Sequence, residues 1–198
     1  MERFFLEVPD ISRKEDAIDY IREFRKYGSD INGSGGLDRY LDDYHGWLLK
    51  LSEDYVREPD EEKVPARTYF LVRENDRKIV GMINIRLALN ERLSRYGGHM
   101  GYSIRPTERG KGYNKINLYL GLKVCDQQGI KSVFMDVDLE NAASWKTMEA
   151  LGGIRIREYF DSQYAHCMVV DYTINVQKAL KEHAGYYEQS ISGLPESL

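Results

Sequence analysis

The middle of the chain passes from a strand-like to a helix-like pattern of apolar residues. Residues 99–105 alternate with period two, which is typical of a β-strand. A glycine-rich basic turn at 109–112 follows. Three apolar residues then recur at helical spacing before position 128: Ile116, Leu120 and Val124. The pattern predicts a strand, a turn and a helix in succession.

The N-terminal third is typical of a short strand followed by two helices. Residues 3–8 are apolar and edged by charge, as in a strand, and Ser12 and Glu15 are spaced as a helix capping box. A second helix is predicted over 37–58, where apolar residues alternate at spacings of four and three. The glycine-rich segment 32–36 between the helices is expected to be a mobile connection.

The remaining segments are mostly strand-like. They predict a hairpin at 67–73 and 79–89, a buried strand at 132–137, a helix at 142–151, and two final strands at 154–160 and 165–176. We therefore expect an α+β (α/β-like) fold with a mixed central sheet of about six to seven strands and about four flanking helices. A single domain should span 1–180, and the polar segment 181–198 should be a flexible tail.

Composition excludes several function classes. The 198-residue chain has a formal net charge of −4, so it lacks the basic balance of a nucleic-acid-binding protein. Its two cysteines, Cys125 and Cys167, indicate a reducing compartment rather than a disulfide framework. We expect no metal site, because no Cys-x-x-Cys or His-x-x-x-His pair occurs. No apolar run is long enough to span a membrane, so we expect a cytoplasmic protein.

The turn Arg109-Gly110-Lys111-Gly112 is a candidate phosphate site. Backbone N–H groups at the start of a helix attract anions, and glycines permit close approach. A Walker loop is not matched, because Gly112 follows Lys111 where Ser or Thr is needed. A dinucleotide fingerprint is not matched either, since Lys115 replaces its third glycine. A tight connection with solvated charges remains the alternative.

Two landmarks in the right order resemble the GNAT superfamily of acyltransferases. Arg109-x-x-Gly112 resembles the acetyl-CoA signature of that family, although Asn114 stands where Gly or Ala is usual. Residues 141–153 resemble the second landmark, an Asn, a short helix and a Leu-Gly-aromatic turn, although Gly153 stands where the aromatic residue is usual. The resemblance covers roughly 67–174 and is strongest to a bacterial branch of predicted acetyltransferases.

This resemblance implies acetyl-CoA as the cosubstrate. The pyrophosphate is expected on the turn and the helix start, at Arg109, Gly110, Lys111, Gly112, Tyr113 and Asn114. The pantetheine arm is expected beside the central strand and the second landmark, at Ser103, Ile104, Arg105, Asn141 and Ser144. From the residues alone, Asn141 could equally cap the following helix, and Ser144 could satisfy backbone in its first turn.

Acetyl transfer to an amine needs a base that removes a proton from the nitrogen. His99 is a candidate because its ordinary pKa lies near neutral, and it stands at the start of the central strand. A histidine held in the core by hydrogen bonds is the alternative. Asp136 and Asp138, at the end of the next strand, are competing candidates.

The leaving thiolate needs an acid, and many members of the family place a Tyr at the position of Met148. Methionine cannot give a proton, so Ser144, Tyr113 or solvent would have to act. We predict an N-acetyltransferase that moves an acetyl group from acetyl-CoA directly to a primary amine of a small molecule or protein, as a monomer or homodimer. The alternatives are a catalytically silent acyl-CoA sensor and another kind of nucleotide-binding domain.

Overall fold

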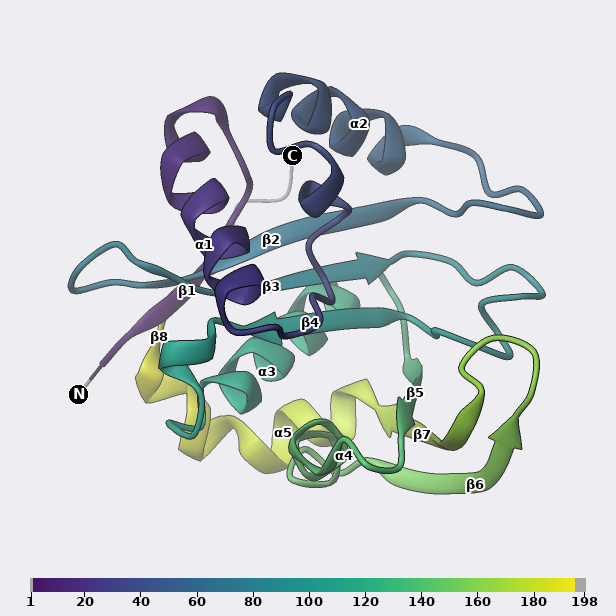
Figure 1. Ribbon diagram of the computed structural model, residues 1–198. Helices are drawn as coiled ribbons and strands as arrows, with labels where there is room; N and C mark the ends of the chain where they lie inside the picture. The colour runs from purple at the N-terminus through teal and green to yellow at the C-terminus, as the bar shows by residue number, and fades with distance from the viewer. Residues whose placement is uncertain (1, 195–198) are drawn as a thin grey trace.

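The computed structural model describes residues 2–194, and within this range the chain has eight strands and five α-helices (Figure 1). In chain order these are β1 (Phe4–Glu7), α1 (Lys14–Lys26), α2 (Tyr44–Val56), β2 (Ala66–Arg73), β3 (Ile79–Arg86), β4 (Met100–Ile104), α3 (Tyr113–Gln127), β5 (Ser132–Asp138), α4 (Ala142–Glu149), β6 (Ile154–Asp161), β7 (Cys167–Asn175), α5 (Val176–Tyr187) and β8 (Ile191–Gly193).

The described strands form two sheets. Five strands pair in the order β4-β3-β2-β1-β8, and three pair in the order β5-β7-β6. All of these pairs are antiparallel except β1 with β8, which is parallel. The predicted α+β class with a mixed sheet is confirmed, although the described strands divide into two sheets and five α-helices replace the expected four.

Helices cover both faces of the larger sheet (Figure 1). On one face α1 and α2 bury a cluster centred on Tyr20, Trp47 and Phe70. On the other, α3 and α5 bury the larger cluster, which includes Leu118 and Leu122 of α3. Helix α3 also contacts β3 and β4 directly, so its first turn is fixed beside the end of β4.

The two sheets meet at only one end of β4 and β5. The His99 N–H donates to the Phe134 carbonyl oxygen at 2.8 Å, and the Phe134 N–H donates to His99 Nδ1 at 3.0 Å. Beyond this junction no ladder joins β4 to β5 in the described part of the chain. Strand β4 therefore has one edge paired with β3 and one edge open along most of its length.

The two N-terminal helices begin at different residues from those predicted. The capping box is not formed, because Asp10 Oδ1 accepts from the Ser12 N–H at 2.7 Å and starts a short 3-10 turn before α1. The second helix, predicted over 37–58, likewise begins later than expected. Helix α2 begins at Tyr44, where Asp43 Oδ1 accepts from the Gly46 N–H at 2.9 Å.

The segment 32–36, for which the sequence predicted a mobile connection, lies directly on β4. Gly33 has a φ of +74°, and a Cβ built on it would lie 2.4 Å from the Gly101 carbonyl oxygen. The Asn32 carbonyl oxygen also accepts from the Ser103 hydroxyl. Glycine is needed here both for the left-handed backbone and for the close approach of two chains.

The prediction of a flexible tail over 181–198 is wrong for its larger part. Helix α5 continues to Tyr187, and β8 pairs with β1. Tyr187 is buried and stacks on Tyr119 of α3 with 5.0 Å between ring centroids, and Ile191 is also buried. These long-range contacts order a segment whose polar composition alone indicated a loose end. Residues 195–198 lie outside the described range.

Candidate functional site

The glycine turn after β4 is open above its backbone. Gly110 and Gly112 have φ values of +77° and +82°, a left-handed conformation that other residues rarely adopt. A Cβ built on either glycine would meet no atom of the described residues within 4 Å. Gly112 is the N-cap of α3 and supplies no side chain to cap that helix.

Five successive N–H groups in this turn point at no acceptor. Arg109 N–H donates to the Pro106 carbonyl oxygen at 3.3 Å, and Lys115 N–H donates to the Gly112 carbonyl oxygen at 3.1 Å. Between them, the N–H groups of residues 110–114 have no partner among residues 2–194. Unpaired N–H groups at the start of a 15-residue helix, together with its dipole, provide partial positive charge that attracts anions.

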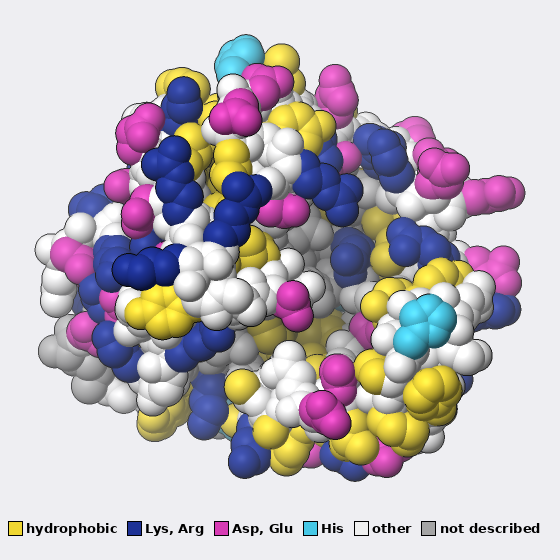
Figure 2. All heavy atoms as spheres, in the orientation of Figure 1, with side chains coloured by type: hydrophobic (Ala, Val, Ile, Leu, Met, Phe, Trp, Pro, Cys, Tyr) yellow, Lys and Arg dark blue, Asp and Glu magenta, His cyan; other side chains and the backbone are white. Residues whose placement is uncertain are grey.

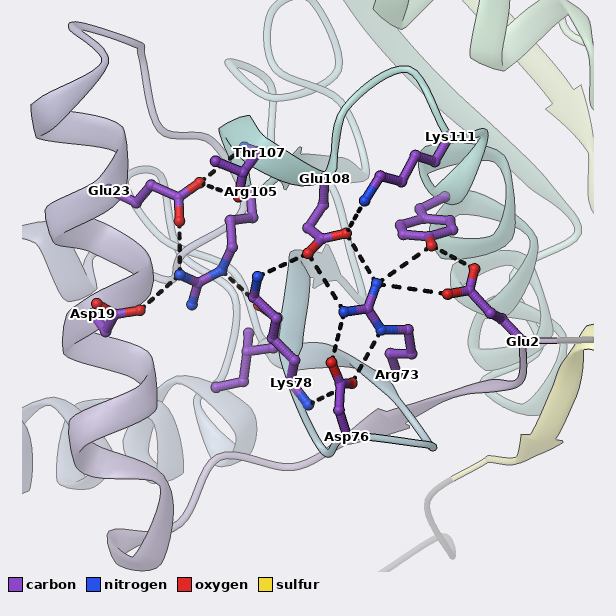
Figure 3. Close-up of polar contacts among 12 residues, drawn as sticks. Glu2, Asp19, Glu23, Arg73, Asp76, Lys78, Arg105, Thr107, Glu108 and Lys111 are labelled. Carbon is purple, nitrogen blue, oxygen red and sulfur yellow. Dashed lines mark hydrogen bonds and ion pairs between the residues drawn. The ribbon is translucent and has the colours of Figure 1, made fainter.

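The buried carboxylate of Glu108 anchors the glycine turn to neighbouring cations. Glu108 is 4% exposed, and its oxygens accept from Lys111 Nζ at 2.7 Å, Lys78 Nζ at 2.8 Å and Arg73 Nη1 at 3.0 Å (Figure 3). Burial alone would raise the pKa of Glu108, but these hydrogen bonds outweigh it and lower the pKa to about 2. The turn is thus tied to β2 and to the β2–β3 hairpin.

The two arginines beside the turn have different surroundings. Arg105 is 3% exposed and donates to the Ile79 carbonyl oxygen at 2.9 Å, to Asp19 at 2.7 Å and to Glu23 at 2.9 Å (Figure 3). Its guanidinium therefore joins α1 to the sheet. It does not lie where the sequence predicted a contact with the pantetheine arm. Arg109 is exposed, and its acceptors among residues 2–194 are neutral, the Ile104 carbonyl oxygen at 3.1 Å and the Ser29 hydroxyl at 2.8 Å.

The open edge of β4 presents backbone groups of alternate residues. Arg105 N–H donates to the Val80 carbonyl oxygen at 2.9 Å, so Arg105 and, two residues earlier, Ser103 direct their peptide groups toward β3. The peptide groups of Tyr102 and Ile104 accordingly face away from β3, into the gap between the sheets. Ile104 is one of the residues that the sequence predicted at the site. Tyr102 is not, although the alternation of the strand indicates it.

Ser103 turns its side chain toward α1 instead of the gap. Its hydroxyl lies 3.0 Å from the Tyr20 hydroxyl and donates to the Asn32 carbonyl oxygen. Ser103 therefore fixes the segment 32–36 on β4. The expected pantetheine contacts of Ser103 and Arg105 have other partners in the fold, because odd-numbered residues of β4 direct their side chains to the α1 side.

Helix α4 forms the opposite wall of the gap. Asn141 Oδ1 accepts from the Ser144 N–H at 3.2 Å, so Asn141 is the N-cap that the sequence allowed as an alternative. The Ser144 hydroxyl lies 3.0 Å from the Tyr102 hydroxyl and thus connects α4 to β4 across the gap. Asn114 joins α3 to α4 through its Nδ2, 3.3 Å from Thr147 Oγ1, while its buried Oδ1 has no described partner.

His99 is held at the junction of the sheets. Its Nδ1 accepts the Phe134 N–H, and burial, followed by nearby Arg86, lowers its pKa. The neutral ring therefore carries its proton on Nε2, and no lone pair on either nitrogen is left to take another proton. His99 thus joins β4 to β5 through both its backbone and its ring.

Asp136 lies beside the same junction. Its Oδ1 accepts from the Gly97 N–H at 2.9 Å. Burial raises the pKa of Asp136, and Asp171, its direct neighbour across β5 and β7, contributes in the same direction. Asp138 is exposed and its Oδ1 accepts from the Glu140 N–H at 2.8 Å, so it caps a turn. Of the two competing carboxylates, Asp136 has the environment of a base.

Tyr113 directs its side chain away from the gap. Its hydroxyl donates to Glu2 and accepts from Arg73 Nη1 at 3.4 Å, and its ring packs on Phe4 with 4.7 Å between centroids. Met148 is 2% exposed and belongs to the core. Neither side chain can supply a proton at the gap between β4 and α4.

An open groove of about 1000 Å³ lies at the other end of β4 from the glycine turn. It is formed by the loops before β2 and β4 and by the β6–β7 hairpin, and Figure 2 shows the surface hollowed on this side. Polar aromatic and charged side chains line it, among them Asp60, Arg92, Tyr96, Tyr159, Asp161 and Tyr164.

Within residues 2–194, no three His, Cys, Asp or Glu side chains are grouped as a metal site requires. None of the helices in that range has the length and apolar character needed to cross a bilayer.

Solved structures share this fold. A ribosomal-protein-S5-alanine acetyltransferase from Vibrio fischeri has a TM-score of 0.63 at 16% identity, covering 88% of this chain and 94% of its own. A microcin self-immunity acetyltransferase in complex with acetyl-CoA and AMP has a TM-score of 0.66 at 13% identity, covering 87% and 92%. A chimera of the Vibrio cholerae spermidine N-acetyltransferase has a TM-score of 0.60 at 11% identity, covering 90% and 99%.

Two sequence comparisons gave different results. A search of curated protein sequences found no match. The sequence model of the Acetyltransferase (GNAT) family, however, matches residues 36–153, which is more than half of the chain and includes the glycine turn, the open strand edge and α4. The chain therefore belongs to the GNAT family of acetyltransferases.

Proposed function

We propose that this protein transfers an acetyl group from acetyl-CoA directly to a primary amine of a small molecule or a protein. The observation that carries the proposal is the row of five unpaired N–H groups at residues 110–114, next to the open edge of β4. Bound acetyl-CoA would supply an activated acetyl thioester. The residues described above would bind it, orient it and handle the protons.

The glycine turn has the chemistry needed to bind the pyrophosphate of the cosubstrate. The space above Gly110 and Gly112 is open, so an anion can reach the backbone N–H groups there. Arg109 has no carboxylate partner in the described part of the chain, and Lys111 is 47% exposed beside Glu108. Both cations can therefore add charge-assisted hydrogen bonds.

The open edge of β4 and the first turn of α4 would position the reacting end. The N–H groups of Tyr102 and Ile104 can donate to the thioester carbonyl oxygen as it gains negative charge. Asn141 Nδ2 and the Ser144 hydroxyl lie on the opposite wall and can hydrogen-bond the pantetheine arm. Preorganised donors of this kind stabilise developing charge without a covalent intermediate on the protein.

Asp136 would serve as the base for the acceptor amine. Its raised pKa moves it toward neutral pH, where a carboxylate removes a proton more effectively. The acceptor would enter through the groove at the start of β4. Solved relatives are named for action on spermidine and on a ribosomal-protein alanine, which are both amines.

Calorimetry with acetyl-CoA tests the cosubstrate site. Gly112→Trp should abolish binding, because the new side chain would cover the unpaired N–H groups. Gly129→Trp is a matched control, since Gly129 also has a left-handed φ and open space but lies at the other end of α3. Unchanged acetyl-CoA affinity in Gly112→Trp would contradict the assignment. CoA release measured over a panel of amines then tests the transfer itself.

A catalytically silent acyl-CoA sensor is the second candidate. The observation that favours it is Met148, an apolar and buried residue where many relatives carry the acidic Tyr. Tight binding of acetyl-CoA without acetyl transfer to any amine of the panel would support the sensor and exclude the enzyme.

A further inference from the structure

Acetyl transfer leaves a thiolate that must gain a proton, and the side chains considered from the sequence do not all remain available. Met148 has no acidic proton, and the Tyr113 hydroxyl donates to Glu2 on the far side of α3. His99 lies at the junction of the sheets with its Nδ1 occupied. Ser144 and solvent remain, and the structure adds a partner to Ser144.

Tyr102 and Ser144 form a hydroxyl pair across the gap between β4 and α4. Their oxygen atoms are 3.0 Å apart. Tyr102 starts from the strand whose open edge faces the gap, and its ring packs against the main hydrophobic cluster. Ser144 is fixed by its N–H, which donates to the N-cap Asn141. Both side chains are therefore held before any ligand arrives.

We propose that the Tyr102 hydroxyl is the proton donor to the leaving CoA thiolate, and that Ser144 is the residue that positions it. This inference rests on the proposed function. It assigns to a strand residue the role that Met148 cannot perform on α4.

The proton and electron balance is simple. The amine nitrogen attacks the thioester carbonyl carbon with its lone pair and forms the carbon–nitrogen bond. The carbon–sulfur bond then breaks, and its electron pair goes to sulfur. The Tyr102 hydroxyl gives its proton to that sulfur, and the phenolate regains one from solvent through the Ser144 hydroxyl. The proton of the amine goes to Asp136. Burial raises the pKa of Tyr102 to about 12, although its hydrogen bond with Ser144 acts in the opposite direction, so the hydroxyl keeps its proton at neutral pH until a base appears beside it.

Binding measurements test the contact without knowledge of the acceptor. CoA and desulfo-CoA differ only at sulfur, so the ratio of their affinities reports a hydroxyl–sulfur hydrogen bond. At pH 9, calorimetry should give wild-type protein a five- to tenfold preference, roughly, for CoA. Tyr102→Phe should reduce this ratio to about one. Tyr119→Phe is the control, since it removes a buried hydroxyl that bonds Glu188 at 2.9 Å on another face of α3.

The possible results distinguish failure of this inference from failure of the proposed function. A ratio in Tyr102→Phe equal to that of wild type would overturn the inference and leave the proposed function intact. Failure of wild-type protein to bind either ligand would overturn the proposed function and the inference with it. The inference would be supported if the affinity ratio fell to about one in Tyr102→Phe and kept its wild-type value in Tyr119→Phe, with similar melting temperatures for the two variants.

Turnover gives a second test once the amine panel provides an acceptor. Tyr102→Phe should lower kcat by about 100-fold and leave KM for acetyl-CoA within about twofold. Ser144→Ala should lower kcat less, and Ser144→Thr should restore it, because threonine keeps the positioning hydroxyl. An unchanged kcat in Tyr102→Phe, or equal changes in kcat and KM, would contradict proton donation.

Discussion

Asp136 of β5 lies directly opposite Asp171 of β7, so two carboxylates face each other across one ladder of the small sheet. Asp171 is almost fully buried and paired with Arg157, whereas Asp136 accepts a hydrogen bond from a backbone N–H. The arrangement raises the pKa of Asp136 through burial and through the charge of Asp171. The small sheet therefore holds a carboxylate with a raised pKa, whereas Nδ1 of His99 is occupied by the Phe134 N–H.

Asp136→Asn should lower kcat by about 100-fold while making the protein more stable at pH 7. A carboxyl whose folded pKa is raised binds its proton more tightly in the folded state, so it destabilises the folded protein as pH rises through the raised pKa. Asparagine removes that penalty and can still accept from Gly97. Melting temperatures at pH 5 and pH 7 check this, since the gain should shrink at pH 5. A less stable variant at pH 7 would contradict the burial argument.

Glu108→Gln should destabilise the protein at pH 7 by about 3 kcal/mol, because three cations lose their shared carboxylate. The folded pKa of about 2 lies below the ordinary value of 4.5. The stability that Glu108 contributes is therefore fully present above the ordinary value and is lost as pH falls toward 2. Urea unfolding at pH 7 and pH 3 measures the difference.

For that experiment the control is Glu74→Gln. Glu74 is 43% exposed and lies 3.7 Å from Arg3, so its loss should change the free energy of unfolding by less than about 1 kcal/mol. A Glu108→Gln effect no larger than the control would show that the buried network contributes little.

Arg105→Met and Arg109→Ala should separate a structural arginine from a ligand-binding one. Arg105→Met leaves two acidic side chains without their buried partner and should cost about 3–5 kcal/mol of stability. In the folded fraction, its affinity for acetyl-CoA should stay close to that of wild type. Arg109→Ala should weaken acetyl-CoA binding by about 1.5–3 kcal/mol with a small effect on unfolding. Urea unfolding and calorimetry on both variants check the contrast; the reverse pattern would restore Arg105 as a cofactor ligand.

Gly33→Ala should destabilise the protein by about 2–4 kcal/mol, through a left-handed backbone and a collision with the backbone of β4. Gly28→Ala is matched in backbone conformation, with a φ of +58°, but its Cβ would meet nothing within 4 Å. It should cost only about 1–2 kcal/mol. Equal losses in the two variants, measured by urea unfolding, would mean that segment 32–36 does not press on β4 in solution.

Most of the elements near the site could be predicted because their signals are local. The period-two run before the turn, the glycines at 110 and 112 and the helical spacing after them became β4, the left-handed turn and α3. The start of α2 could not be predicted. The helical spacing of apolar residues already begins upstream of Asp43, but Asp43 caps a helix that starts only at Tyr44. The order of 181–193 was also missed, because burial of Tyr187 depends on a helix far away in the chain.

The sequence by itself determined the α+β class and the position of the glycine turn, because backbone conformation and apolar periodicity are properties of neighbouring residues. Its motifs and its match to the family model gave the family. Only the tertiary structure decided which side chains face the gap. It turned Arg105 and Ser103 toward α1, occupied Nδ1 of His99 and brought Tyr102 to Ser144. Those outcomes depend on which segments meet across long loops, and a hydrogen-bonding side chain takes whichever partner that packing provides.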